Sequence, residues 1–192
     1  NAIGTALIEE RPVEVYGAEH FLEHNSILTC SAAPLLDAQG RLLGVLDISG
    51  DHRGYQRHTL GLVRMSAQIL EKRLFESAHA ADILVSFHPS VEYLGSLREG
   101  LLAVSPDGRM QAVNQAGLEL LGQRRCDVVQ RDFSVLFETP LGSLADRFRR
   151  HAVAGAVATT REGRQFHVRL RGELPPPLTA SRMVIEAPAA RR

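Results

Sequence analysis

The sequence predicts an α+β protein with two small domains, each built on an antiparallel sheet, joined by a long helix. Two pairs of apolar runs flank the turn sequences DAQG at residues 37–40 and PDG at residues 106–108, which is typical of β-hairpins. Between the two hairpins, from Leu60 onward, apolar residues recur every three or four positions, as on one face of a helix. Three further apolar runs near the C-terminus indicate strands, at residues 155–160, 165–171 and 182–187.

The first region contains strand signals and one polar stretch. Pro12 to Tyr16 alternates its side chains and stops at Gly17, which predicts a short strand. Residues 18–25 (AEHFLEHN) are mostly polar and predict a short helix or a loop. The runs ILTCSAAPLL and LLGVLDISG, on either side of the first turn, predict the clearest hairpin of the chain.

The connecting stretch reads as a helix over residues 56–86. Its apolar residues follow the a/d spacing of a coiled coil, and no proline interrupts residues 56–88. We therefore expect this helix to pair with a second copy in parallel. The residues predicted to hold the two helices together are Leu60, Val63, Leu70 and Leu74. A second stripe (Leu62, Met65 and Ile69) is expected to pack on the preceding sheet; alternatively, both stripes form the core of one domain.

The last region combines a second hairpin with helices and further strands. Asn114 is expected to cap a helix that ends before Gly122. Residues 126–137 predict a broken helix, and residues 140–152 an amphipathic one. Residues 161–164 form the expected turn between the first two C-terminal strands.

Composition excludes several function classes. Twenty-two basic residues balance twenty-two acidic ones, so no net field favours direct binding to nucleic acid or to an anionic membrane. The two cysteines lie far apart, which favours a reducing cytosol over a disulfide scaffold. No apolar run is long enough to span a bilayer. We therefore expect a cytoplasmic protein.

Two segments resemble known sensory domains. NAIGTALIEERPVEVYGAEHF, followed by LTCSAAPLLDAQGRLLGVLDISGDHRGY and LVRMSAQILEKRLF, resembles the sensory region of acetoin-catabolism-type activators, which are sigma-54-dependent transcription factors. The segment LREGLLAVSPDGRMQAVNQAGLELLG resembles the opening of a PAS domain. These resemblances imply the C-terminal part of a GAF domain at residues 1–75, a connecting and dimerising helix at 56–86, and a PAS-like domain at 87–188.

The same resemblance implies a function. The chain holds no GxxxxGK[ST] phosphate loop and no basic helix pair, so the motor and DNA-reading parts of that family are not in it. The family's GAF domain is expected to begin well before Asn1. The implied role is that of a regulatory region that senses a small effector (acetoin-like by resemblance), forms a homodimer, and is neither an enzyme nor a cofactor carrier.

Other functions remain open at this point. The same domains occur as sensory regions of histidine kinases and cyclic-dinucleotide enzymes, and a ligand-free dimerisation scaffold is a further alternative. A catalytic GAF protein, such as a free methionine sulfoxide reductase, relies on cysteine pairs, and this segment has a single cysteine.

The candidate effector pockets lie in both domains, and no catalytic or metal site is predicted. The expected lining residues are Cys30 and Ser31 in the first domain and Leu118, Leu121, Phe137, Phe148, Phe166 and Val168 in the second. Other reactive residues have ordinary interpretations. His20 and His24 have metal-ligand spacing but are interpreted as surface histidines, and Asp47, Asp51 and His52 as a strand end followed by a solvated turn. Cys126 does not match the flavin-adduct motif of PAS domains. His151 and His167 have no surroundings that suggest haem ligation.

Overall fold

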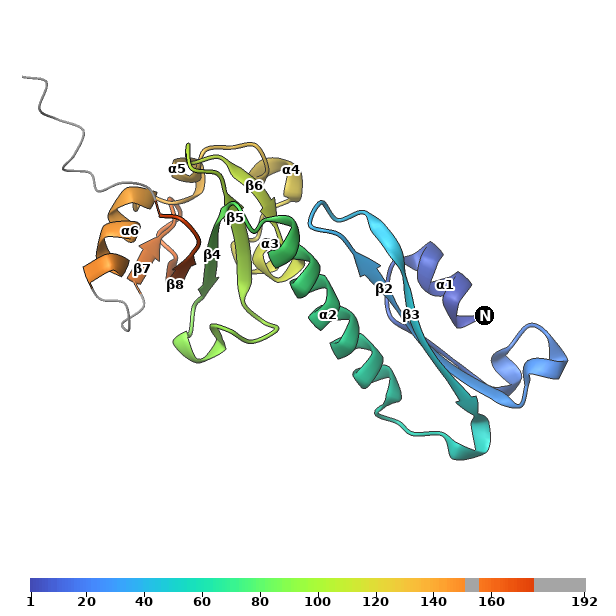
Figure 1. Cartoon of the computed structure of the whole chain (residues 1–192). Helices are drawn as coiled ribbons and strands as arrows, with labels where there is room; N and C mark the ends of the chain where they lie inside the picture. Colours follow the sequence, from blue (N-terminus) through green and yellow to red (C-terminus); the bar gives the residue numbers. More distant parts are fainter. Residues whose placement is uncertain (151–155, 175–192) are drawn as a thin grey trace, which may run out of the picture.

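The computed structural model describes residues 1–150 and 156–174, and it contains two separate antiparallel sheets, as predicted (Figure 1). The first sheet has the strand order β1-β2-β3. Its strands are β1 (Val13–Tyr16), β2 (Leu28–Leu36) and β3 (Leu42–Asp51). The hairpin β2–β3 is confirmed, and its turn is tied by Asp37, whose side chain accepts hydrogen bonds from the backbone of Gln39 and Arg41.

Two helices cover opposite faces of this sheet (Figure 1). Helix α1 (Ala2–Glu9), which the sequence patterns did not indicate, packs on one face through Ala2 and Ala6. Helix α2 (Thr59–Ala78) packs on the other face through Val63 and Ala67. Two short 3-10 turns, Gly17–Glu19 and Glu23–Asn25, form within or beside the polar stretch. A third, His52–Gly54, lies between β3 and α2.

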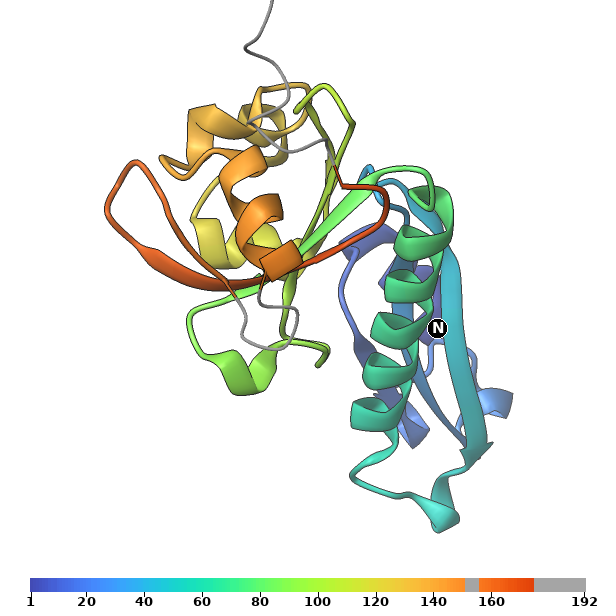
Figure 2. The same cartoon turned by 60° about the vertical axis from the view of Figure 1, so that its left-hand side comes forward.

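The second sheet has five strands in the order β6-β5-β4-β8-β7. The strands are β4 (Ile83–His88), β5 (Gly100–Val104), β6 (Met110–Val113), β7 (Ala156–Thr159) and β8 (Gln165–Arg171). Between β6 and β7 the chain forms α3 (Gln115–Leu121), α4 (Arg125–Val128), α5 (Phe133–Leu136) and α6 (Leu141–Arg150). These helices cover one face of the sheet (Figure 2). The end of α2 and the tip of the β2–β3 hairpin cover the other face.

The prediction of one helix over residues 56–86 is wrong at its C-terminal end. Helix α2 stops at Ala78, and Ile83–His88 form the central strand of the second sheet instead. The second domain therefore begins at β4, ahead of residue 87. Ile83 and Val85 point toward the helices, whereas Leu84 points toward α2, so the strand is buried on both faces. A strand of this kind reads as a continuous apolar run and shows no alternation.

Local capping signals of the second domain are confirmed. The Asn114 side chain accepts a hydrogen bond from the Gly117 backbone at 2.8 Å, and Gly122 ends α3 in the left-handed conformation at φ 64°. The broken helix appears as α4 and α5, and the amphipathic helix as α6. The strand predicted at residues 182–187 lies outside the described residues.

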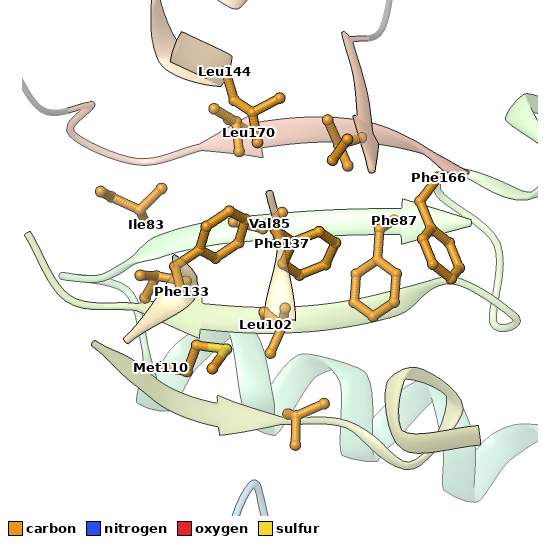
Figure 3. Packing of buried hydrophobic residues seen from close by; sticks show 14 of the residues in the cluster. Ile83, Val85, Phe87, Leu102, Met110, Phe133, Phe137, Leu144, Phe166 and Leu170 are labelled. Carbon is orange, nitrogen blue, oxygen red and sulfur yellow. The ribbon is translucent and has the colours of Figure 1, made fainter. Parts of the chain in front are cut away.

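The main core of the second domain combines aliphatic side chains with the rings of Phe87, Phe133, Phe137 and Phe166 (Figure 3). Phe133 and Phe137 stack with ring centroids 4.5 Å apart, and Phe87 meets Phe166 edge-on at 5.4 Å. This core fixes the helices α3–α6 on the sheet.

Candidate functional site

The six candidate pocket residues of the second domain lie together, around its main core. Leu121, Phe137, Phe166 and Val168 are buried in this core, and Leu118 and Phe148 are partly buried against it. Because these side chains pack on the stacked and edge-on rings, their position is that of core residues. Their role as the lining of an effector pocket stays a prediction.

The two candidates of the first domain point away from each other. Cys30 packs with Ala2 and Ala6 of α1. Ser31 lies on the α2 face, where its hydroxyl donates to Glu14 Oε2 at 3.1 Å. Consecutive strand residues face opposite sides of a sheet, so Cys30 and Ser31 cannot line one pocket.

The structure places a histidine against Cys30. His20 Nε2 lies 3.4 Å from Cys30 Sγ, and both residues are buried, at 7% and 9% exposure. The Ser49 hydroxyl lies 3.1 Å from the same sulfur and donates to Asp47 Oδ2 at 2.6 Å. We call Cys30, His20, Asp47 and Ser49 the thiol cluster. Sequence spacing pairs His20 with His24, and no local signal connects His20 to a strand residue ten positions later.

The other reactive residues have separate structural partners. Asp51 caps the turn after β3, and its side-chain hydrogen bonds with Arg53 lower the pKa of Asp51 to about 2. His52 Nδ1 lies 3.0 Å from the Ile27 carbonyl. Cys126 is exposed, and His167 pairs with His88 across β8 and β4. His151 lies outside the described residues.

Helix α2 exposes the second stripe, which was expected to pack on the sheet, and only part of the predicted seam. Val63, predicted to contact a second copy, is buried against Ala33 and Ala67 of its own domain. Leu62, Met65 and Ile69, predicted to pack on the sheet, are 54%, 55% and 47% exposed. Leu70 and Leu74 are each 43% exposed and stay available for contact, whereas Leu60 is half-buried.

The two domains meet at a joint that contains a hollow of about 460 Å³. On the first-domain side, Glu71 of α2 accepts a hydrogen bond from the Leu36 backbone at 2.8 Å, and burial raises the pKa of Glu71. From the second domain, Arg125 donates to the Ala38 carbonyl at the hairpin tip at 2.8 Å and to the Val113 carbonyl. The hairpin tip and α2 therefore both attach to the second domain.

An ion pair strengthens the same joint. Lys72 Nζ lies 2.7 Å from Glu99 Oε1, and Glu99 is buried at 2% exposure. Glu99 also accepts a hydrogen bond from the Gly95 backbone at 2.5 Å. A buried carboxylate of this kind depends on its partners, so Lys72 anchors α2 to the second domain.

The described residues contain neither a metal-binding cluster nor a membrane-spanning helix. Within residues 1–150 and 156–174, no group of three or more histidine, cysteine or acidic side chains is arranged to hold a metal ion. In the same part of the chain, no helix combines the length and apolar character needed to cross a membrane.

Known proteins match both the first domain and the longer chain. Residues 1–74 match the family described as GAF domain. The acetoin catabolism regulatory protein of Cupriavidus necator is 32% identical over 187 residues, covering 92% of this chain and 28% of that protein. The signal-transduction and transcriptional-control protein of Clostridium beijerinckii is 27% identical over 139 residues, covering 72% and 22%. The acetoin dehydrogenase operon transcriptional activator AcoR of Bacillus subtilis is 42% identical over 74 residues, covering 38% and 12%.

These matches define a class of regulatory domain. Residues 1–74, which form the first sheet and most of α2, are GAF-domain sequence. The chain is a GAF-containing region of the acetoin-catabolism-regulator type, which confirms the resemblance found in the sequence. It spans less than a third of the length of each of these relatives.

Proposed function

We propose that this chain is the sensing and dimerising region of a cytoplasmic, sigma-54-dependent transcriptional activator. In this role it binds a small acetoin-like effector, catalyses no reaction and makes no direct contact with nucleic acid. The GAF-domain match and the regulators among its relatives support this class of function.

The observation that carries the proposal is the position of α2 between the two sheets. Val63 and Ala67 pack on the first sheet, and about two turns after Ala67, Phe75 packs with Leu84 and Leu101 of the second sheet. A shift of α2 on one sheet therefore changes its contacts with the other. A packed helix with two neighbouring arrangements is a common element for transmitting a signal.

The second domain is proposed to be PAS-like. The supporting features are the five-stranded antiparallel sheet and the four helices between β6 and β7. The Asp-Gly turn and the Asn114 cap of α3 add to this support. The proposed division is a GAF part at residues 1–75, helix α2 as the connection, and a PAS-like domain that starts at β4 and extends to about residue 188.

The proposed dimer uses the exposed apolar side of α2. The face formed by Leu62, Met65 and Ile69 and the flank formed by Leu70 and Leu74 are separate sides of the helix, so they can be tested separately. We expect Leu62→Glu/Ile69→Glu or Leu70→Glu/Leu74→Glu to convert a dimer into a monomer in sedimentation velocity, with unchanged circular dichroism. A dimer that survives both double substitutions contradicts this part of the proposal.

Effector binding is tested by thermal shift. Acetoin is expected to raise the Tm of the chain, because a ligand that binds only the folded state stabilises it. An equal concentration of butane-2,3-diol, which lacks the carbonyl group, is the matched control. If neither compound changes the Tm over the whole titration, the result argues against effector sensing by this region.

A further inference from the structure

The thiol cluster holds a nucleophile and a base in direct contact. Cys30 comes from β2, and His20 follows the 3-10 turn at Gly17–Glu19. The two residues lie ten positions apart in the sequence, and their contact is made on the α1 face of the sheet, between β2 and the segment that follows β1. The thiolate is the reactive form of cysteine, so a base beside the sulfur changes what Cys30 can do.

The tautomer of His20 follows from its second contact. His20 Nδ1 lies 2.9 Å from the Gly17 carbonyl oxygen, which only accepts hydrogen bonds. In the neutral ring Nδ1 therefore carries the proton, and Nε2 is free to accept the proton of the Cys30 thiol. A nucleophile, a base and a group that orients the base are the parts of an activated nucleophile.

Asp47 adds an independent polar group to the cluster. Its Oδ1 atom is buried and receives no hydrogen bond from the residues that the structure describes, whereas Oδ2 accepts from Ser49. Buried polar atoms normally have a partner, so Oδ1 can accept a hydrogen bond from a bound hydroxyl group.

The surroundings of Cys30 contain few other charges. Helix α1 presents Ala2 and Ala6, β1 presents Val13 and Val15, and β3 presents Asp47. Glu14 of β1 is bonded to Ser31 on the opposite face. Ser49 is exposed, so the sulfur lies directly beneath the protein surface.

We propose that the thiol cluster binds a small α-hydroxy ketone as a reversible covalent adduct on Cys30. The proposal deepens the sensory function and rests on it for the identity of the effector class. The sulfur adds to the carbonyl carbon, so one S–C bond forms and the C=O π bond breaks. The thiol proton passes through His20 Nε2 to the carbonyl oxygen, which gives a hemithioketal without any oxidant or leaving group. The neighbouring hydroxyl of the ligand donates to Asp47 Oδ1.

The test is site-resolved alkylation with iodoacetamide, read by peptide mass spectrometry. The exposed Cys126 is an internal reference thiol in the same chain. At pH 6.5 an ordinary cysteine is only about 1% thiolate. We expect Cys30 to react about tenfold faster than Cys126 despite its burial, and His20→Gln to remove this advantage without changing the rate at Cys126.

Protection by the ligand completes the test. Excess acetoin is expected to slow the alkylation of Cys30 about threefold or more, reversibly on dilution, and to leave Cys126 unaffected. Asp47→Asn should keep the fast alkylation but weaken the protection. Equal rates at the two cysteines, a His20→Gln rate like that of the wild type, or no protection by acetoin each overturns the proposal. The rate ratio and the protection are measured on the unmodified chain, so they do not depend on the folding of a variant.

Failure of this proposal can be separated from failure of the proposed function. If acetoin raises the Tm but does not protect Cys30, the sensory function stands and the adduct is overturned. If acetoin protects Cys30 and raises the Tm but leaves the oligomeric state unchanged, the adduct stands and the coupling of effector binding to dimerisation is contradicted.

Discussion

The core that packs against the second sheet contains large aromatic side chains, whereas the core residues of the first sheet are small. Phe87, Phe133, Phe137 and Phe166 are all buried under the helices of the second domain. The buried contacts of the first sheet come from small residues, namely Ala2, Ala6, Cys30, Ala32, Ala33, Val63 and Ala67. Phenylalanines bury far more area per residue than alanines, so the two sheets differ in how much burial stabilises them.

Because of this difference, we expect the helices on the first sheet to shift more easily than the core of the second domain. Alanines let α1 and α2 approach the first sheet closely, but they interlock little with it. A modest change in binding free energy can therefore shift these helices, while the aromatic core of the second domain keeps its arrangement. We expect an effector to act on the first domain, and we expect the second domain to keep its arrangement when α2 shifts.

Removing one ring from the second core is expected to have the largest effect. Phe137→Ala deletes a fully buried ring that stacks on Phe133, and it should lower the free energy of unfolding by about 3–5 kcal/mol. Urea unfolding measures the loss, and hydrogen exchange should show it first in β8. Val135→Ala, at an exposed position of α5 two residues before Phe137, is the control and should change stability by less than about 0.5 kcal/mol. Equal losses in the two variants contradict the assignment of the core.

A single methyl group can distinguish the packing of the two sheets. In Gly100→Ala the new Cβ lies 2.4–2.7 Å from the Phe87 ring, which is held by Phe166 and Phe137, so a loss of about 1–3 kcal/mol is expected. Gly44→Ala in β3 is the matched control, because its methyl group meets no atom within 4 Å. Gly44→Ala should be neutral or slightly stabilising in the same urea titration. A tolerated Gly100→Ala substitution means that the second core is looser than described.

Val63 and Leu70, both members of the predicted seam, test which part of the seam belongs to the core of the protomer. Val63→Ala removes the equivalent of two buried methylene groups and should cost about 1.5–2 kcal/mol of unfolding free energy at a protein concentration where the chain is monomeric. Leu70→Ala should leave that value nearly unchanged and weaken self-association instead. Analytical ultracentrifugation and urea unfolding of both variants separate the two effects. If Val63→Ala instead weakens self-association and leaves the unfolding free energy of the monomer unchanged, the full heptad seam predicted from the sequence is favoured.

Glu71→Gln is expected to have the smallest effect, and its sign depends on pH. Burial raises the pKa of Glu71 in the folded chain, and the hydrogen bond from the Leu36 backbone offsets part of the shift. The folded state therefore holds this proton more tightly than the unfolded state, whose value is near 4.5, and ionisation lowers stability as pH rises above that value. Glutamine still accepts the hydrogen bond and carries no charge.

The expected outcome is a small gain in Tm at pH 7 that disappears below about pH 4. Glu92→Gln, at an exposed position, should show no such dependence on pH. A loss of stability at pH 7 indicates that the joint needs the negative charge of Glu71.

Features that depend on a few neighbouring residues were predictable from the sequence. The β2–β3 turn needs only Asp37 and the amides that follow it, and α3 needs only Asn114 at its start and Gly122 at its end. The match to GAF-containing regulators was likewise visible in the order of residues from Asn1 to Phe75. In each case the relevant hydrogen bonds or residue order lie within one continuous stretch.

Features that depend on distant partners were decided only by the tertiary structure. The run ILVSFH became a strand because β5 and β8 pair with both of its edges while α2 and the other helices bury its two faces. Val63 is buried, and Leu62 is not, because Ala33 of β2 lies beside Val63. His20 meets Cys30 only because β1 and β2 pair and bring the segment after β1 over the sheet. A helical or apolar pattern records which side chains avoid water, but the surface that covers them is contributed by residues elsewhere in the chain.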